Sequence, residues 1–265
     1  MTMKRMNKKL RTVYLIVNSV IIFLLHIPCV FAKAAVNKIK NGPDGASPLV
    51  TSVTTSAGNN HNFFSSLLKH LNVFDSLHLN LNGLSKNIFE MAVKGLEKLK
   101  QSGVIISDNI ISIADFSQPS SNKRLYIIDL DNYSLLFNTY VAHGQNSGKE
   151  YAEHYSNRPQ SLQSSPGFYI TMDTYLGSNG YSLKLNGLEH GINNNALRRD
   201  IVLHGAAYVN ESLINEQGYI GRSWGCPAVP LDLHRQIIET IKNGTCLFIY
   251  PGQSSYLQKS SLIKE

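Results

Sequence analysis

The 265-residue chain contains little cysteine and little charge. Its three cysteines exclude a small fold that is held together by a disulfide framework. Charged residues make up only 16% and apolar residues 43%, a balance that excludes a wholly disordered or collagen-like chain. No internal repeat is present, and the length suffices to bury a full hydrophobic core. These absences leave one globular domain with at most a small extension.

Acidic residues are missing from residues 1–32, and this gap explains most of the net charge of +7. The basic side chains of this segment are Lys4, Arg5, Lys8, Lys9 and Arg11. Removing these five from the 25 basic residues leaves 20 against 18 acidic residues, a net charge of +2. A remainder so close to neutrality gives no electrostatic reason to expect a nucleic-acid partner.

Residues 1–32 have the layout of a secretory signal peptide. The basic cluster precedes an apolar run over residues 13–30, and small residues follow at Ala32 and Ala34. The run is also long enough to cross a membrane, which takes roughly 17–25 residues, so an uncleaved anchor is the alternative. We expect an exported protein of the periplasm or cell envelope that contacts the membrane only through this signal or anchor.

Composition divides the next part of the chain. Residues 33–60 are rich in Ser, Thr, Asn and Gly without apolar periodicity, which predicts a flexible linker. Residues 61–103 predict a helical N-terminal extension with a short helix over 61–72. Its clearest helix covers 85–101, where apolar residues share one face and Ser85 is a suitable N-cap. Residues 251–265 predict a disordered C-terminal tail.

A β pattern covers residues 104–250, which we expect to form the catalytic domain. Short β-branched or aromatic runs predict strands at 110–116, 124–130, 134–142, 167–172, 201–204 and 245–250. A turn at 131–133 joins the second and third runs into a hairpin, and 231–243 predicts a helix. The polar stretches 143–165 and 173–200 are typical of functional loops. The predicted fold class is therefore mainly β (α+β).

The residues with the clearest chemistry lie between 201 and 230. One motif is His204-Gly205 at the end of a predicted strand, and the other is Ser223-Trp224-Gly225-Cys226-Pro227. A thiol becomes a strong nucleophile when a nearby histidine takes its proton. Backbone N–H groups around Gly225 and Cys226 would hold the oxyanion of a tetrahedral intermediate. The alternatives are a buried thiol or a disulfide with Cys246, although Cys246 alternates with aromatic residues as a core thiol would.

The strings HGAAYV at 204–209 and GRSWGCPA at 221–228 resemble the L,D-transpeptidase catalytic domain family (YkuD-like), and more narrowly its murein L,D-transpeptidases. The family signature is a histidine-glycine motif followed by Ser/Thr-x-Gly-Cys, and the likeness covers roughly residues 84–250. This sequence departs from it in carrying Trp224 in place of a frequent second histidine, and Pro227-Ala228 in place of an apolar-Arg or apolar-Asn pair. The resemblance implies a β-sandwich or barrel.

The resemblance also implies a mechanism that uses no metal or organic cofactor. Cys226 would be the nucleophile, His204 the base, and the carbonyl of Gly205 would orient the imidazole. The thiolate would attack the third residue of a peptidoglycan tetrapeptide stem, and the terminal D-alanine would leave. An amine of a second stem would then attack the thioester and form a 3–3 cross-link. The implied partners are donor and acceptor stems.

The remaining motif residues are expected to bind the substrate. Ser223, Trp224 and Gly225 would shape the pocket and the oxyanion site. Arg222 would anchor a substrate carboxylate, because a guanidinium binds carboxylates in a bidentate manner. His143, in a second histidine-glycine pair, would line the cleft. Two further groups are interpreted as surface charges, namely Lys184 and the pair Arg198-Arg199.

Other functions stay open at this point. A zinc peptidase would need ligands such as His143, His190, His204 or Cys226, but the sequence has no HExxH-type spacing. Another alternative is a protein that binds peptidoglycan without catalysis, in which Cys226 and His204 would have no catalytic role. The same thioester chemistry with water would give an L,D-carboxypeptidase, and with an envelope protein it would attach that protein to the wall or release it.

Overall fold

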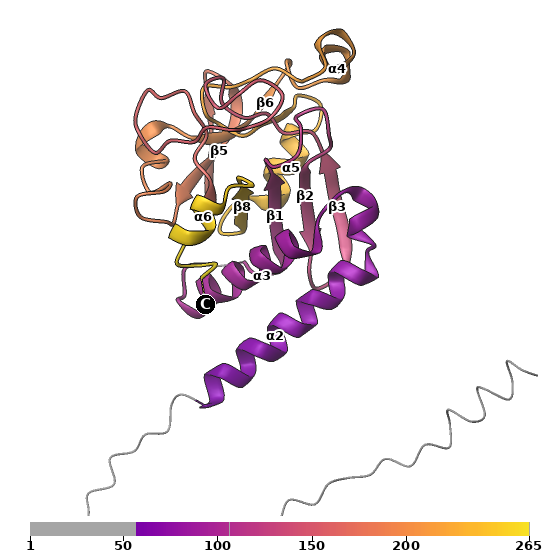
Figure 1. Ribbon diagram of the computed structural model, residues 1–265, viewed down its shortest axis with the longest axis vertical. Helices are drawn as coiled ribbons and strands as arrows, with labels where there is room; N and C mark the ends of the chain where they lie inside the picture. The colour runs from indigo at the N-terminus through magenta and orange to yellow at the C-terminus, as the bar shows by residue number, and fades with distance from the viewer. Residues whose placement is uncertain (1–56, 106, 265) are drawn as a thin grey trace, which may run out of the picture. The chain divides into compact units, whose positions relative to one another are not determined.

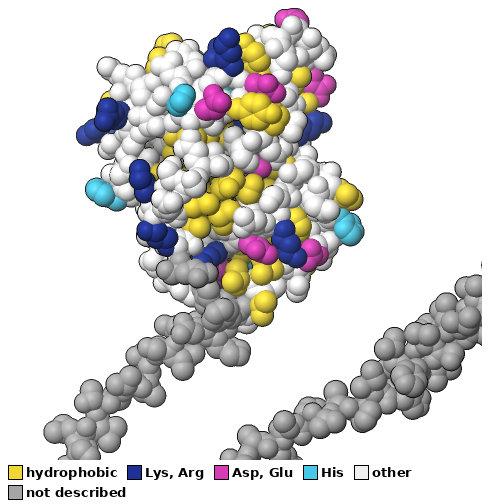
Figure 2. Space-filling view, in the orientation of Figure 1, with side chains coloured by type: hydrophobic (Ala, Val, Ile, Leu, Met, Phe, Trp, Pro, Cys, Tyr) yellow, Lys and Arg dark blue, Asp and Glu magenta, His cyan; other side chains and the backbone are white. Residues whose placement is uncertain are grey.

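The computed structural model describes residues 57–105 and 107–264 (Figure 1). The predicted signal peptide at 1–32 and all but the end of the predicted linker at 33–60 lie outside these residues. Within the described part, no helix is both long enough and apolar enough to span a membrane. Figure 2 shows basic and acidic side chains scattered over one face rather than gathered in a basic patch, as the near-neutral charge outside 1–32 leads us to expect.

The N-terminal part consists of two helices, α2 (Ala57–Ser76) and α3 (Lys86–Gln101), joined by the short 3-10 helix η2 (Leu79–Asn82). The helix predicted over 85–101 is confirmed, with Ser85 as its extended N-cap. The helix predicted over 61–72 is longer than expected at both ends, and it begins within the predicted linker. α2 packs on α3, and α3 lies against β1 and β8 (Figure 1).

A glycine sets how closely α3 approaches the sheet. A Cβ atom on Gly95 would lie 2.1 Å from a ring carbon of Phe168, far inside van der Waals contact. Glycine is unfavourable within a helix relative to alanine, so its presence here has a packing reason. The Phe168 ring in turn stacks on Phe248 at a centroid distance of 4.3 Å. The helical extension therefore shares one core with the sheet.

Eight strands form one mixed sheet in the order β3-β2-β1-β8-β4-β5-β6-β7. The strands are β1 (Ile110–Asp115), β2 (Leu125–Asp129), β3 (Ser134–Thr139), β4 (Gly167–Gly177), β5 (Gly180–Gly187), β6 (Val202–Ala206), β7 (Ala228–Pro230) and β8 (Cys246–Tyr250). β1 pairs with β8 and β6 with β7 in parallel, while the other pairs are antiparallel. All six predicted strands are confirmed with ends that shift by at most three residues, except that β4 continues five residues beyond its predicted end.

The two ends of the sheet meet. Ala142, just beyond β3, forms an antiparallel bridge with Ala228 of β7, with N–H to carbonyl distances of 2.8 and 3.4 Å. Gly144 continues the contact through a parallel bridge to Ser223. The sheet thus nearly closes into a barrel, which leaves little of either edge strand unpaired. The predicted class, mainly β with a helical N-terminal part, is confirmed.

Successive side chains of a strand point to opposite faces of the sheet, so apolar residues form one hydrophobic core on each face. On β8, Cys246 and Phe248 join the core beneath α3, whereas Leu247 and Ile249 point into the second core. That second core is covered by α5 (His234–Ile241), which buries its three isoleucines. The helix predicted over 231–243 is therefore confirmed with shorter ends. Cys246 is a fully buried core thiol, as its alternation predicted.

Three segments differ from the sequence-based expectations. The polar stretch 173–200, predicted to be a loop, carries the second half of β4 and all of β5, which pair as a hairpin. The C-terminal tail is not disordered over its length, because it contains helix α6 (Ser254–Lys259), whose Tyr256 is buried and donates to Glu189. A short helix, α4 (Glu211–Gln217), and strand β7 were not predicted.

Candidate active site

The parallel pair of β6 and β7 brings the two sequence motifs together. His204 lies opposite Ala228, and its backbone N–H donates to the carbonyl oxygen of Pro227 at 3.4 Å. Cys226 directly precedes Pro227, so the turn before β7 places it next to β6. The side chains of Cys226 and His204 line one cleft with a volume of about 420 Å³. Its other walls come from the β4–β5 hairpin and from residues 199–202 and 222–224.

The Cys226 thiol is protonated in this arrangement. Its S–H donates to the carbonyl oxygen of Asp200, 3.6 Å away, and its sulfur accepts the N–H of Val202 at 3.5 Å. Burial raises the pKa of the Cys226 thiol above its usual value, against a smaller lowering by the Val202 N–H. A base is therefore needed to form the thiolate. Cys226 and Cys246 are both free thiols, so the disulfide alternative is contradicted.

His204 is held in the tautomer that a base requires. Its Nδ1 lies 3.0 Å from the carbonyl oxygen of Gly205. Because a carbonyl oxygen only accepts, Nδ1 carries the proton and Nε2 keeps its lone pair. Burial lowers the pKa of His204 below the usual histidine value, so the imidazole is neutral at pH 7. Gly205 also leaves room for His234, whose ring carbon would lie 2.6 Å from a Cβ at this position.

Ser223 and Gly225 shape the turn that carries Cys226. The buried Ser223 hydroxyl donates to the carbonyl oxygen of Cys226 at 2.6 Å and accepts the N–H of Gly225 at 3.0 Å. Gly225 has a φ of 125°, and a Cβ there would lie 2.8 Å from the carbonyl oxygen of Gln163. Only glycine fits such a backbone position well. Both residues therefore act by fixing the backbone of the turn.

The oxyanion site differs in one respect from the sequence-based expectation. The Gly225 N–H is committed to the Ser223 hydroxyl and is not free to bind an oxyanion. The N–H of Cys226 has no acceptor among the described residues and is the donor that the turn offers beside the thiol. Preorganised N–H donors of this kind stabilise developing charge strongly in a cleft with little water.

Trp224 is a cleft wall and not a core residue. Its side chain is 75% exposed, and it lines the same cleft as Cys226. A large exposed aromatic ring beside a buried thiol offers apolar contact area to a bound molecule. Trp224 is also the only tryptophan of the chain, which makes it a natural fluorescent reporter for this cleft.

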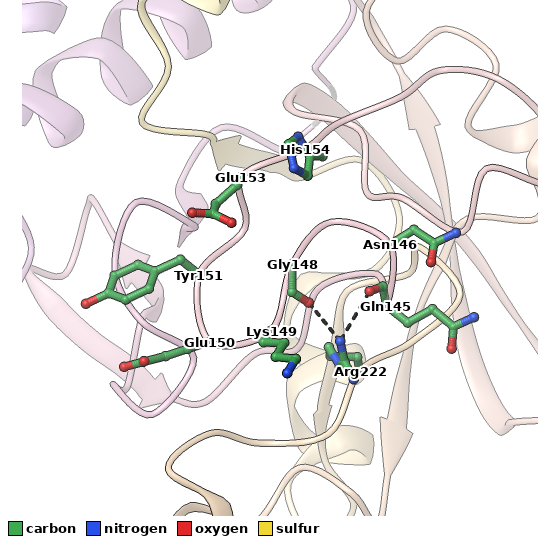
Figure 3. Close-up of a pocket in the computed structure, with 9 residues that line it drawn as sticks. All are labelled: Gln145, Asn146, Gly148, Lys149, Glu150, Tyr151, Glu153, His154 and Arg222. Atoms are coloured by element: carbon green, nitrogen blue, oxygen red, sulfur yellow. Dashed lines mark hydrogen bonds between the residues drawn. The ribbon is translucent and has the colours of Figure 1, made fainter.

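Arg222 connects the cleft to a second hollow of about 460 Å³ (Figure 3). Its Nη1 donates to the carbonyl oxygens of Gln145 at 3.3 Å and Gly148 at 3.0 Å, both in the loop that surrounds this hollow (Figure 3). Its Nε and Nη2 have no hydrogen-bond partner among the described residues. Arg222 therefore holds the loop with one nitrogen and leaves two nitrogens able to donate.

His143 does not line the cleft, contrary to the sequence-based expectation. It is fully buried, and its Nδ1 accepts from Nη2 of Arg124 at 2.8 Å. Burial, with a smaller contribution from the Arg124 charge, lowers the pKa of His143 to about 3. Only its backbone acts on the motif, since its carbonyl oxygen accepts the N–H of Ser223 at 2.9 Å. The histidine-glycine pair at 143 is a support for the turn.

Sequence reasoning missed two charged residues of the cleft, Arg199 and Asp200. Lys184 pairs with Asp173 at 2.8 Å and Arg198 is exposed, so both are surface charges as expected. Arg199, by contrast, is only partly exposed and lines the cleft with Cys226. An Arg-Arg pair on a polar stretch carries no signal that one side chain turns inward. In the described part of the chain, no group of three or more His, Cys, Asp or Glu side chains could hold a metal ion.

Comparison with known proteins agrees with the sequence motifs. Residues 80–250 match the model of the L,D-transpeptidase catalytic domain family, and the chain belongs to this family. No curated protein matches the chain.

Solved structures that resemble the chain include three L,D-transpeptidases. The protein from Mycobacterium smegmatis is 10% identical, with a TM-score of 0.33 over 53% of this chain and 58% of that chain. L,D-transpeptidase 1 of Mycobacterium tuberculosis is 12% identical, with a TM-score of 0.30 over 53% of this chain and 60% of that chain. The protein from Stackebrandtia nassauensis is 14% identical, with a TM-score of 0.32 over 63% of this chain and 69% of that chain. The match thus spans about three fifths of the length of the first two.

Proposed function

We propose that this chain is an exported cysteine acyltransferase of the cell wall, an L,D-transpeptidase that joins peptidoglycan stem peptides by 3–3 cross-links. One observation supports this more than any other. The Cys226 thiol and a His204 imidazole whose Nε2 is free line the same cleft. Membership of the L,D-transpeptidase catalytic domain family supports the same chemistry. Export rests on the signal-like sequence of residues 1–32 alone.

The first half-reaction forms a thioester. Nε2 of His204 takes the thiol proton, and the sulfur of Cys226 attacks the carbonyl carbon of the third residue of a tetrapeptide stem. The carbonyl oxygen becomes an oxyanion and accepts the Cys226 N–H. When the intermediate collapses, the bond to D-alanine breaks and the imidazolium returns its proton to the leaving amine. Free D-alanine and an acyl-enzyme result.

The second half-reaction releases the enzyme. The side-chain amine of an acceptor stem attacks the thioester and loses a proton to His204, and the Cys226 sulfur leaves and recovers that proton. The new amide bond is the 3–3 cross-link. Water as acceptor would give an L,D-carboxypeptidase, and an amine of an envelope protein would couple that protein to the wall.

Two cleft residues suit a stem peptide. Arg222 keeps guanidinium N–H groups that would bind a stem carboxylate in a bidentate manner. Trp224 offers an exposed ring that would cover the apolar part of the donor. We expect Arg222→Ala to raise KM more than it lowers kcat, since it removes a binding group remote from the reacting atoms. An unchanged KM would remove Arg222 from the binding site.

Product masses test the proposed function. The chain without residues 1–32 is mixed with tetrapeptide muropeptides, with Cys226→Ala as the inactive variant and Cys246→Ala as a matched control. A dimer that has lost one D-alanine, made by the wild type and by Cys246→Ala only, supports transpeptidation. Trimmed monomer alone assigns water as the acceptor. No product from folded, reduced protein, or full product from Cys226→Ala, contradicts the proposal.

A further inference from the structure

Two adjacent arginines on one short 3-10 helix, η3 (Leu197–Arg199), have different environments. Arg198 is exposed, whereas Arg199 is partly buried and lines the cleft together with Cys226. The residue that follows, Asp200, is the one whose carbonyl oxygen accepts the Cys226 thiol at 3.6 Å. Arg199 is thus one residue away from a direct contact with the nucleophile.

Both Nη atoms of Arg199 are bound to one loop. Nη1 donates to the Ser156 carbonyl oxygen at 2.7 Å and to the Ser165 hydroxyl at 2.5 Å. Nη2 donates to the Ser161 hydroxyl at 3.1 Å and to the Gln163 carbonyl oxygen at 2.7 Å. All four acceptors lie within residues 156–165. A guanidinium makes such a fork of directed bonds, and an ammonium group does not.

The loop that Arg199 holds lies behind the nucleophile turn. The Gln163 carbonyl oxygen packs against Gly225, where a Cβ would lie 2.8 Å from it. The neighbouring Ser164 hydroxyl donates to the Gly225 carbonyl oxygen at 3.1 Å. A movement of residues 163–164 would therefore move the backbone that carries Cys226.

The charge of Arg199 has no partner within the described residues. All four of its acceptors are neutral, and no ion pair includes it. Its Nε is buried and has no hydrogen-bond partner either. A guanidinium taken from water without a counter-charge is unfavourable, so a purely structural clamp would be better made by neutral groups. The anion that arises in this cleft during the reaction is the Cys226 thiolate.

We propose that Arg199 is a positioning residue for the nucleophile. Its guanidinium fastens residues 156–165 behind the Cys226 turn and supplies the fixed positive charge that favours the Cys226 thiolate. This role rests on the proposed function, in which Cys226 is the nucleophile. It assigns a part to a side chain that lies outside both motifs, five residues before His204 and 27 before Cys226.

The titratable and charged groups that face the thiol are Arg199 and Asp200 before β6, His204 on β6, Arg222 in the motif segment, and the tyrosines Tyr169, Tyr175 and Tyr208. Arg222 is a second cation of this cleft, but Arg199 is the one whose charge lowers the pKa of Cys226. Asp200 acts in the opposite sense, since its carboxylate raises the pKa of Cys226 while Arg199 lowers it. Burial lowers the pKa of the Arg199 guanidinium overall, and the negative charge of a Cys226 thiolate acts against this lowering, so the interaction favours the charged form of both groups.

The test measures thiolate formation without any substrate. Iodoacetamide reacts with thiolates, and mass mapping of the Cys226 peptide gives the alkylation rate at each pH. We compare the wild type with Arg199→Gln, Arg199→Lys and the matched control Arg198→Gln. Arg199→Gln is expected to move the midpoint of the profile up by about one pH unit, a roughly tenfold slower alkylation below the midpoint. Arg198→Gln and Arg199→Lys are expected to keep the wild-type midpoint.

Hydrogen exchange of residues 156–165 tests the clamp separately. Arg199→Lys keeps the positive charge but loses the paired hydrogen bonds of the guanidinium, so we expect faster hydrogen exchange in residues 156–165. In Arg198→Gln the exchange rate of these residues should equal that of the wild type. If Arg199→Gln does not fold, Arg199→Met, which keeps the apolar stem, gives the same comparison. An unmoved midpoint in the neutral variant that folds would overturn the electrostatic role, and unchanged exchange in Arg199→Lys would overturn the clamp. Neither readout depends on cross-linking, so a failure here is distinct from a failure of the proposed function.

Discussion

Ser223→Ala is the substitution whose effect the structure allows us to work out most fully. The Ser223 hydroxyl is buried and makes two hydrogen bonds within the turn that carries Cys226, one to the Cys226 carbonyl oxygen and one from the Gly225 N–H. Alanine leaves both backbone groups without their partner. A buried polar group left unpaired costs about 1–3 kcal/mol, and water that enters from the cleft compensates a part of this. We therefore expect a loss of about 2–4 kcal/mol in unfolding free energy.

The same substitution should reduce activity. The turn presents both the Cys226 thiol and the Cys226 N–H, and loss of one oxyanion donor typically costs about 10²–10³ in kcat. Because Ser223→Ala loosens this donor without removing it, we expect kcat to fall by about tenfold or more. KM should change little, since the hydroxyl is engaged with the backbone and not with the substrate.

Thermal unfolding and steady-state rates check this expectation together. For a domain of this size, 1 kcal/mol corresponds to about 2–4 °C in Tm, so the loss should be about 4–16 °C. Ser223→Thr keeps the hydroxyl and should recover most of both losses. Ser255→Ala makes the same chemical change at an exposed position of α6. If Ser223→Ala matched Ser255→Ala in Tm and kcat, the role given to the Ser223 hydroxyl would be refuted.

Three further expectations concern other parts of the molecule. Gly95→Ala should lower the unfolding free energy by about 1–3 kcal/mol in a thermal melt, because the new Cβ overlaps the Phe168 ring; an unchanged Tm would show that α3 can move away. The acid limb of the kcat/KM profile should lie below pH 6.5, because burial lowers the pKa of His204 and the neutral base persists to lower pH; a limb above pH 6.5 would contradict this. Fluorescence emission from Trp224 should shift to shorter wavelength when a donor stem binds to the Cys226→Ala variant, since the ring is 75% exposed before binding. An unchanged emission spectrum at a saturating concentration of stem peptide would remove Trp224 from the donor site.

The parts of the site that could be predicted are those with a local signal. His204 and Cys226 belong to short motifs whose residue types carry the chemistry, and the strands next to them are β-branched runs. The Ser223 and Gly225 positions follow from the same motif. Their roles were assigned to the pocket, but the structure shows that the hydroxyl and the φ of 125° serve the backbone of the turn.

The parts that could not be predicted depend on tertiary contacts. β5 is rich in Gly, Ser and Asn and becomes a strand because β4 and β6 pair with it on either side. Helix α6 is fixed by the contact of Tyr256 with Glu189, 67 positions away along the chain. The positions of Arg199 and His143 also depend on tertiary contacts. Nothing in the local sequence distinguishes Arg199 from its exposed neighbour Arg198. Nor does the local sequence predict that His143 is buried against Arg124, outside the cleft.

Trapping of the acyl-enzyme tests the central claim most directly. The chain without residues 1–32 is mixed with a tetrapeptide muropeptide, stopped with acid, and its intact mass is measured. We expect an adduct equal to the muropeptide minus D-alanine, on the peptide that contains Cys226, removed by hydroxylamine and also formed by Cys246→Ala. No adduct from active wild-type protein, or an adduct that persists in Cys226→Ala, would contradict a thioester on Cys226.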